Sequence, residues 1–122
     1  MDANGERRPA LFSITEVVKV MGLSKRTLQY YDQIGLLPAT ERTTGGYRQY
    51  DEEAIEILRR ISRYKGMGYE LKEIRRILES KDYDWEKSLK VKRDDLKKRQ
   101  DETSEMLENV EKALRQLPER NP

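Results

Sequence analysis

The first apolar clusters of the chain predict two short helices joined by a very tight turn. Residues from Ser13 to Glu16 form a capping-box pattern directly before an apolar set, so a helix begins there. Gly22 can end it in a left-handed conformation, and Ser24 can cap a second helix that runs to about Ile34. These lengths and this turn fit a helix-turn-helix.

The second of these helices, residues 25–34, has two different faces. Leu28 and Tyr31 lie three positions apart and can pack on the first helix. Hydrogen-bond donors and a flat ring lie mostly elsewhere around the helix, at Lys25, Arg26, Gln29 and Tyr30. This outer face can contact a partner such as nucleic acid, or it can be the solvated polar face of any amphipathic helix.

Residues 40–50 predict a small β-hairpin, or wing, because β-branched and aromatic residues flank a Gly-Gly pair. Side chains alternate between the two faces of a strand. The residues that share a face are Tyr47 with Gln49, and Arg48 with Tyr50. One face can pack inward while the other meets a partner, and the alternation leaves open which is which.

Two further helices complete the predicted core. Asp51 can cap a helix whose apolar positions are Ile55, Leu58, Ile61 and Tyr64. The segment Gly66-Met67-Gly68-Tyr69 breaks it, and a fourth helix with apolar residues at 71, 74, 77 and 78 runs to about Ser80. We expect these helices to share one core and the fold class to be mainly α.

A single long helix is predicted from a cap at Asp84 to Leu117, because this stretch contains neither Gly nor Pro. At 1.5 Å per residue it spans roughly 50 Å, more than the preceding domain could cover. Its heptad pattern indicates a coiled-coil dimer with Leu89, Leu96, Thr103, Leu107, Val110, Leu114 and Leu117 at the seam. Arg93 and Gln100 weaken one side of the seam, so the pairing can be offset, antiparallel or supported by other surfaces. The alternative is a lone charged helix folded back on its own domain.

Composition excludes several kinds of chemistry. The chain has 122 residues with no Cys and no His, which rules out disulfides, iron–sulfur clusters, thiolate or imidazole metal sites, and Cys- or His-based catalytic triads. No phosphate-binding loop or dinucleotide fingerprint occurs, and the abundant carboxylates fit helix first turns and solvated faces. We therefore expect no metal, no cofactor and no enzyme activity.

Hydropathy and charge limit the kinds of partner that the chain can have. No apolar run approaches membrane length, and the polar residues 1–9 hold no signal-peptide stretch, so we expect a soluble, cytoplasmic protein with no membrane partner. The net charge is only +2, but the excess lies within residues 13–80, which carry twelve basic and ten acidic groups. Because acidic residues gather at 51–56, a basic face can form elsewhere in this stretch.

Five short motifs follow one another along the chain: Ser13-Ile14-Thr15-Glu16-Val17, Leu23-Ser24-Lys25-Arg26-Thr27-Leu28-Gln29-Tyr30-Tyr31-Asp32, Gly35-Leu36-Leu37-Pro38, Gly46-Tyr47-Arg48-Gln49-Tyr50 and Gly66-Met67-Gly68-Tyr69. Together they resemble the MerR family of bacterial transcription regulators. The resemblance covers residues 12 to about 80 as a winged helix-turn-helix and continues into the long helix. Residues 82–89 resemble, more narrowly, the drug- and thiopeptide-responsive activators of that family.

The resemblance implies double-stranded DNA as a partner and a homodimer joined by an antiparallel coiled coil. Each subunit would place its second helix in a major groove while the wings hold the DNA backbone. Family members typically bind inverted-repeat promoter sites whose spacer is too long, and they bend and untwist it so that the recognition elements of RNA polymerase align. RNA polymerase is then an indirect partner, and the effector is unknown.

The resemblance also assigns DNA contacts by position. Lys25 and Arg26 would meet bases or phosphates, and Tyr30 would contact the backbone. The full set is Ser24, Lys25, Arg26, Gln29, Tyr30, Tyr47, Arg48, Lys65 and Tyr69. The residues assigned to the core instead are Leu28, Tyr31, Ile55 and Leu58. Gln29 departs from the Arg usual in the family, since it keeps the reach and a donor but loses the charge.

The expected organisation is a flexible N-terminus at 1–11, the winged domain at 12–80, the dimerisation helix at 84–117 and a tail at 118–122. Many relatives carry an effector-binding domain, or metal- or cluster-binding cysteines, after the dimerisation helix. Only five residues follow it here. We therefore expect the chain to be either the DNA-binding fragment of a drug-binding regulator or a naturally sensorless regulator.

Two other functions stay open. A coiled-coil interaction module without a role on DNA would leave Arg26 and Arg48 as solvated surface. Small-molecule binding could use an aromatic groove formed by Tyr64, Tyr69, Tyr83 and Trp85. Packing of the long helix onto the domain also explains these rings.

Overall fold

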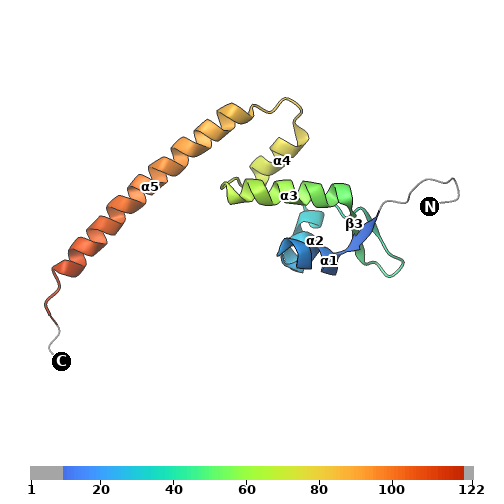
Figure 1. Cartoon of the computed structure of the whole chain (residues 1–122), viewed down its shortest axis with the longest axis horizontal. Coiled ribbons are helices and arrows are strands. Elements are labelled where there is room, and N and C mark those ends of the chain that lie inside the picture. Colours follow the sequence, from blue (N-terminus) through green and yellow to red (C-terminus); the bar gives the residue numbers. More distant parts are fainter. Residues whose placement is uncertain (1–9, 120–122) are drawn as a thin grey trace. The chain divides into compact units, whose positions relative to one another are not determined.

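The computed structural model describes residues 10–119, which divide after Ser80 into two compact units. The first contains, in chain order, β1 (Leu11–Ser13), α1 (Ile14–Met21), α2 (Lys25–Gln33), β2 (Glu41–Arg42), β3 (Arg48–Asp51), α3 (Glu52–Gly66) and α4 (Leu71–Glu79) (Figure 1). The second contains α5 (Trp85–Arg115). The predicted fold class, a mainly α winged helix-turn-helix followed by a long helix, is confirmed.

Side-chain caps begin the first two helices where the sequence predicts them. The Oγ of Ser13 accepts a hydrogen bond from the backbone N–H of Glu16 at 3.1 Å, and the Glu16 carboxylate accepts one from the Ser13 N–H at 3.2 Å. Gly22 follows α1 with a φ of 67°, a left-handed conformation that glycine adopts without strain. Ser24 then caps α2 by accepting from the Thr27 N–H at 3.1 Å. Local chemistry alone therefore produces the tight helix–turn–helix.

The three strands form an antiparallel sheet in the order β1-β3-β2. The hairpin of β2 and β3 is the predicted wing. β1 was not expected, because three residues are too few to show an alternating pattern, and only pairing with β3 defines the strand. Leu11 lies opposite Asp51, so the folded unit includes one residue of the N-terminus that was expected to be flexible. Residues 1–9 of that segment lie outside the described residues.

The core of the first unit contains side chains from the helices and from the wing. Its buried apolar residues are Val17, Leu28, Tyr31, Leu36, Leu37, Tyr50, Ala54, Leu58, Ile61, Tyr64, Tyr69, Ile74 and Ile77. The face of the wing that carries Tyr50 points inward, since this side chain is 1% exposed whereas Tyr47 is 73% exposed. Ile55, assigned to the core from sequence, is only half-buried because the neighbouring Ala54 takes the inward position of α3.

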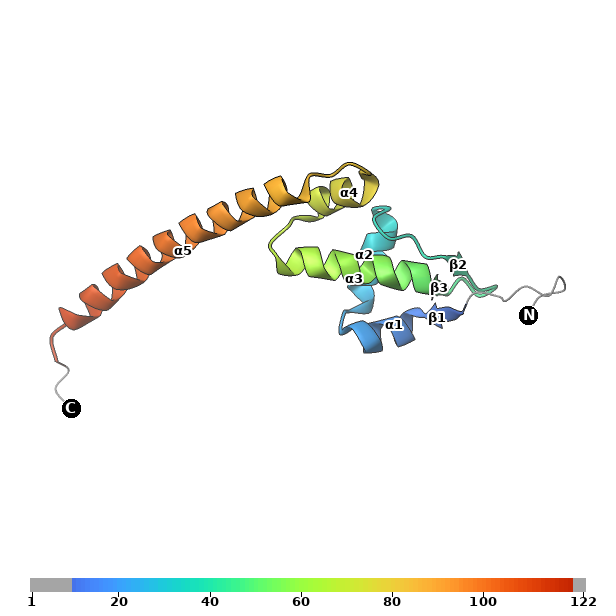
Figure 2. The ribbon, with the colours of Figure 1, turned by 45° about the horizontal axis from the view of Figure 1, so that its top comes forward.

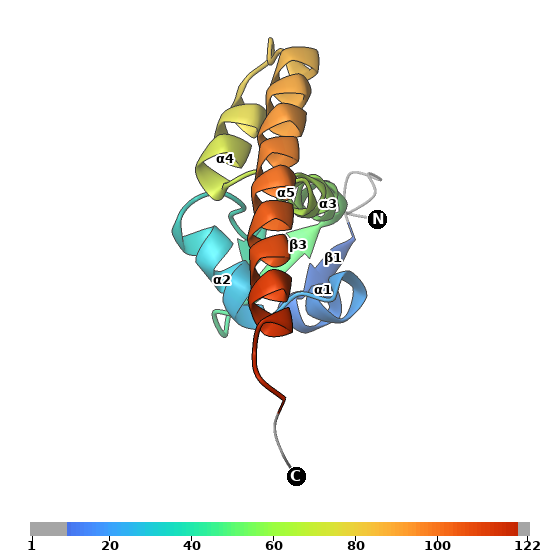
Figure 3. The same ribbon diagram turned by 90° about the vertical axis from the view of Figure 1, so that its left-hand side faces the viewer.

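Helix α3 occupies the middle of the first unit. Figures 1 and 2 show α4 on one side of it and α1 on the other. Figure 3 shows β1 and β3 side by side, as their pairing requires. Arg75 on α4 donates hydrogen bonds to the backbone carbonyls of Ile34 and Gly35, just past the end of α2. These contacts join α4 to α2 and leave the outer face of α2 at the surface.

Helix α5 begins as predicted but packs differently from the other helices. The Asp84 carboxylate accepts a hydrogen bond from the Lys87 N–H at 3.1 Å, and the rings of Tyr83 and Trp85 meet edge to face at 5.5 Å between centroids. None of the side chains of α5 is buried. Trp85 is half-buried, and the other large apolar side chains of α5 are 42–63% exposed: Leu89, Val91, Leu96, Met106, Leu107, Val110 and Leu114. A helix of this length with an open apolar seam is typical of one half of a coiled coil.

Candidate nucleic-acid interface

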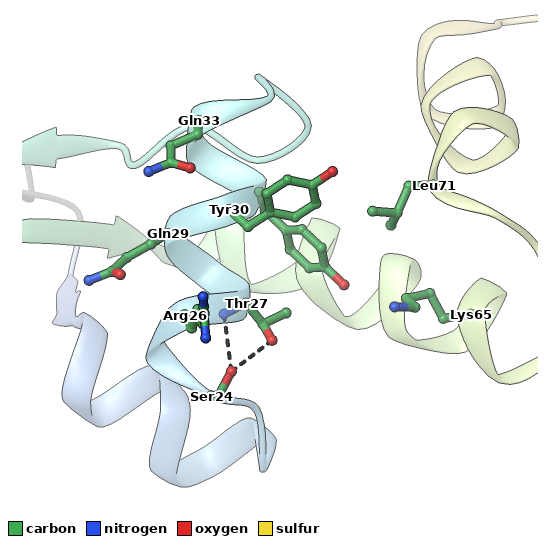
Figure 4. Close-up of a pocket in the computed structure, with 9 residues that line it drawn as sticks. Ser24, Arg26, Thr27, Gln29, Tyr30, Gln33, Lys65 and Leu71 are labelled. Carbon is green, nitrogen blue, oxygen red and sulfur yellow. Dashed lines mark hydrogen bonds between the residues drawn. The ribbon is translucent and has the colours of Figure 1, made fainter.

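The exposed face of α2 borders an open hollow of about 590 Å³. Its lining residues are Ser24, Arg26, Thr27, Gln29, Tyr30, Tyr31, Gln33, Lys65 and Leu71. Figure 4 shows Tyr30, Lys65 and Leu71 around one side of this space, with Gln29 and Gln33 extending from the opposite side of α2. The fold thus brings the end of α3 and the start of α4 next to the face of α2 that the sequence singled out.

The hollow gathers five of the nine residues expected to contact DNA: Ser24, Arg26, Gln29, Tyr30 and Lys65. The hydroxyl of Ser24 is occupied by capping, since it lies 3.1 Å from the Thr27 nitrogen and 2.8 Å from the Thr27 hydroxyl (Figure 4). Arg26, Tyr30 and Lys65 are exposed at the surface. Two cations and a phenol next to a surface helix can hold anionic groups along both edges of that helix.

The wing presents Tyr47 at its tip. The Tyr47 N–H donates to the Thr43 hydroxyl at 3.1 Å, and its carbonyl accepts from the Thr43 N–H at 2.9 Å. Gly46 precedes it with a φ of 82°. Together with the hydrogen bond from the Gly46 N–H to the Thr43 carbonyl at 2.8 Å, these contacts hold the backbone of the turn, and the aromatic ring is left open to a partner.

An ion-pair cluster centred on Asp32 joins the wing to α2. One oxygen of the Asp32 carboxylate lies 2.7 Å from the Nε of Arg48 and 3.1 Å from a terminal nitrogen of Arg42. The hydrogen bond from Arg48 is the main cause that lowers the pKa of Asp32, followed by the backbone N–H of Ala39 and the charges of both arginines, while partial burial opposes them. At neutral pH the carboxylate is therefore ionised and holds both wing strands to α2.

This cluster was not found from the sequence. Arg48 was expected to meet phosphate, whereas its Nε is engaged by Asp32 and its side chain is only 18% exposed. Asp32 had no assigned role, and it lies 10 and 16 residues from its two partners. No local pattern connects residues at such separations, so only the fold reveals the pairing.

Tyr69, which was also expected to contact DNA, is buried in the core of the first unit. Its side chain is 3% exposed, and its ring meets Tyr64 edge to face at 6.5 Å between centroids. Arg60 donates a hydrogen bond to the Tyr64 hydroxyl at 3.1 Å. Two of the three tyrosines of the proposed aromatic groove, Tyr64 and Tyr69, are thus part of the core of the first unit, and the ring of Tyr69 is almost wholly closed to solvent.

Comparison with known proteins decides the family. The model of the MerR HTH regulatory protein family matches residues 12–81. The mercuric resistance operon regulatory protein of Bacillus cereus is 34% identical over 117 residues, which cover 91% of this chain and 86% of that protein. The chain belongs to the MerR family. The family expected from the sequence motifs is therefore confirmed, and with it a DNA-binding transcription regulator.

Longer MerR-family regulators are also similar. The transcriptional activators mta of Bacillus subtilis and TipA of Streptomyces coelicolor are each 31% identical over 84% of this chain. The chain spans only 40% of mta and 41% of TipA.

Solved structures of MerR-family proteins share this fold. The N-terminal part of the B. subtilis multidrug transporter activator superposes with a TM-score of 0.76 at 31% identity, covering 84% of this chain and 97% of that one. HiNmlR, a MerR-family regulator lacking the sensor domain and bound to promoter DNA, superposes with a TM-score of 0.58 at 25% identity over 86% of this chain.

Within residues 10–119, no group of three or more Cys, His, Asp or Glu side chains is placed to hold a metal ion. None of the helices described there is long and apolar enough to cross a membrane.

Proposed function

We propose that the chain binds an inverted-repeat promoter site as a homodimer and places α2 of each subunit in a major groove. The observation that carries this proposal is that polar side chains of α2 and Lys65 line one open hollow, with Arg26 exposed and Gln29 half-buried. Arg can pair with the edge of guanine and Gln with the edge of adenine in a major groove. Arg26 and Gln29 are the matching side chains here, and Gln33 adds a second amide one turn later.

Phosphate contacts would lie on either side of α2. Lys65 and the hydroxyl of Tyr30 border the hollow, and Tyr47 stands exposed on the wing. Contacts of this kind orient a protein on the duplex without selecting a sequence. Because Asp32 ties the wing to α2, the spacing between these backbone contacts and the base-reading face is set by the fold.

The homodimer is supported by the unburied apolar seam of α5. A two-fold symmetric dimer presents two identical reading helices, which matches an inverted repeat. Distorting the spacer costs roughly 1–6 kcal/mol by smooth bending estimates, which phosphate contacts must offset. RNA polymerase would be affected through the shape of the promoter, in the cytoplasm where the DNA lies.

Selection from a random duplex library at two salt concentrations tests this function. We expect an inverted repeat to be recovered, with affinity that falls steeply as salt rises because phosphate contacts release counterions. Gel shifts that show no preference for any inverted repeat over random duplex would disprove the proposal and favour a protein-interaction module.

Two substitutions distinguish base recognition from contact with the phosphate backbone. Arg26→Ala should cost about 1–3 kcal/mol on the selected site and relax the preference at one base pair, whereas Lys65→Ala should weaken binding to all sequences alike and reduce the salt slope by about one. Lys112→Ala, an exposed residue on α5, is the matched control. Equal effects of Arg26→Ala on specific and random duplex would remove Arg26 from base recognition.

A further inference from the structure

The outward side of α2 changes in chemistry along the helix. Leu28 and Tyr31 are buried, and at about 3.6 residues per turn the positions directly opposite them are Arg26 and Gln33, with Gln29 slightly to one side. The basic residues of α2 lie in its first turn, and its last turn holds none. From Gln29 onward, the outward side therefore presents amides and no cation.

The two amides, Gln29 and Gln33, lie four residues apart, which is about one helical turn. Figure 4 shows both side chains extending from the same side of α2. Gln33 is exposed and Gln29 is half-buried, and both line the open hollow. Within residues 10–119, no hydrogen bond to another residue engages either amide. Both are therefore available to a partner that approaches this side of the helix.

We propose that Gln29 and Gln33 are specificity-determining residues that each recognise an adenine, so that each half of the promoter site carries two A·T pairs about two base pairs apart. This inference rests on the proposed function, which places α2 in a major groove, and adds the bases that are recognised there. A separation of four residues is about 6 Å along the helix, and successive base pairs are about 3.4 Å apart. A helix lying along the groove would therefore bring the two amides to base pairs about two steps apart.

The donors and acceptors of an amide match adenine better than the other bases. In the major groove, adenine offers its N7 acceptor beside its N6 amino donor, and a glutamine amide offers a donor beside an acceptor. Guanine offers two acceptors, N7 and O6, so the amide carbonyl would face an acceptor. Thymine offers only its O4 acceptor and cytosine only its N4 donor, so one half of the amide would stay unpaired. Two good hydrogen bonds form only with adenine.

The acidic residue of α2 does not compete for these positions. A carboxylate recognises cytosine by accepting a hydrogen bond from its N4 amine. Asp32 is the only acidic residue in α2, and its carboxylate is engaged by Arg48 and Arg42. The outward side of α2 therefore offers Arg26 for guanine and two amides for adenine, with no free carboxylate for cytosine.

Neutral amides also affect how the binding affinity is distributed between DNA sequences. Affinity for random duplex comes from cations that neutralise phosphates and release counterions, and an amide releases none. The hydrogen bonds of Gln29 and Gln33 would therefore form fully only on the matching site. They raise the ratio of specific to non-specific affinity more than they raise affinity itself.

Selection from a random duplex library, carried out with variants of the full chain, identifies the two base pairs. The unsubstituted chain should recover an inverted repeat with two adenines in each half. Gln33→Ala should lose the preference for one adenine and Gln29→Ala for the other, while binding to random duplex changes by less than about threefold. Gln116→Ala makes the same change at the exposed end of α5 and should select the unaltered site.

Replacement of a selected adenine by 7-deazaadenine tests the contact at the level of one atom. This analogue lacks the N7 acceptor but keeps the N6 amine and still pairs with thymine. At the adenine assigned to Gln33, it should weaken binding of the unsubstituted chain about tenfold and leave binding of Gln33→Ala unchanged within about twofold. An equal loss for both chains would overturn the contact, because a purely structural role of Gln33 does not depend on N7.

Exchanging the amides for charged groups should change the preferred base. Gln33→Glu should shift the preference from adenine to cytosine, because a carboxylate only accepts hydrogen bonds. Gln29→Arg should shift it to guanine and should also raise binding to random duplex, because it adds a cation. Loss of affinity without any new preferred base would overturn the inference.

The outcomes separate this inference from the proposed function. An inverted repeat without these adenines, or an equal weakening of specific and random duplex by Gln29→Ala and Gln33→Ala, overturns the inference while a dimeric regulator on DNA would stand. Failure of the unsubstituted chain to recover any inverted repeat overturns both.

Discussion

The two units of this chain use apolar side chains in opposite ways. Within residues 10–80, the first unit buries thirteen apolar residues, including Leu58 and Ile61 at 0% exposure. Helix α5 buries none, although it carries leucines at regular intervals. A helix can satisfy all its internal hydrogen bonds alone, but its apolar face becomes stabilising only when something covers it. The first unit is therefore stabilised by its own packing, whereas we expect the exposed apolar seam of α5 to need a partner.

The largest expected effects come from truncating one leucine in each unit, because the two truncations should change different properties. Leu58→Ala in α3 leaves a cavity in a closed core and should lower the free energy of unfolding by about 2–5 kcal/mol at any protein concentration. Leu107→Ala in α5 should leave the unfolding of the first unit unchanged and raise the dissociation constant of the dimer instead. Urea unfolding and sedimentation measured over a hundredfold range of concentration distinguish the two. A concentration-independent loss for Leu107→Ala would mean that α5 packs within its own chain.

Removing the ion-pair cluster should have a smaller effect, confined to the first unit. Asp32→Asn keeps the shape but leaves Arg48 and Arg42 without their carboxylate, and we expect a loss of about 1–3 kcal/mol in the free energy of unfolding. DNA affinity should fall as well, because the wing is no longer held to α2. The exposed pair of Asp95 and Arg99 on α5 is the control, since Asp95→Asn should change stability by about 0.5 kcal/mol or less.

The pH dependence of the free energy of unfolding provides a second test of the same ion-pair cluster. The pKa of Asp32 is lower in the folded chain than in the unfolded one, so its ionised form stabilises the fold. This stabilisation is fully present above the unfolded pKa of about 4 and is lost as the pH falls through the lower folded value. Unfolding measured between pH 6 and pH 3 should show a steeper loss for the unsubstituted chain than for Asp32→Asn. Parallel curves would contradict this assignment.

The smallest expected effect is at Tyr50. Among the residues that the structure describes, its buried hydroxyl has no hydrogen-bond partner, and burial raises the pKa of this phenol, as does the charge of Asp32. Tyr50→Phe removes the unpaired group and keeps the ring in the core, so stability should stay the same or rise by up to about 1 kcal/mol. Thermal unfolding checks this, with Tyr31→Phe as the control. A large loss would show that the hydroxyl is hydrogen-bonded in solution.

Local chemistry explains why so much of the architecture could be predicted. Ser13, Ser24, Asp51 and Asp84 all cap helices in the structure, and each needs only residues within three positions. Glycines at the ends of helices and the heptads of α5 are equally local. The family motifs combine these signals, which is why the family and the mainly α fold follow from them.

The candidate interface was predictable only in part. Arg26, Gln29 and Tyr30 lie on the outer face of α2, as helical periodicity requires once Leu28 and Tyr31 are buried. The position of Lys65 beside them depends on how α3 crosses α2, and no spacing in the sequence encodes that crossing. Burial of Tyr69 likewise depends on the path of the chain between α3 and α4.

The sequence by itself determined where the helices begin and end, the family, and the spacing of apolar residues on α5, because each depends on neighbours along the chain. Only the tertiary structure decided which face of the wing is buried, that residues 11–13 form a strand, and that Asp32 holds Arg42 and Arg48. Strand pairing and ion pairs join residues distant in sequence, and their energies arise only after the fold has brought those residues together.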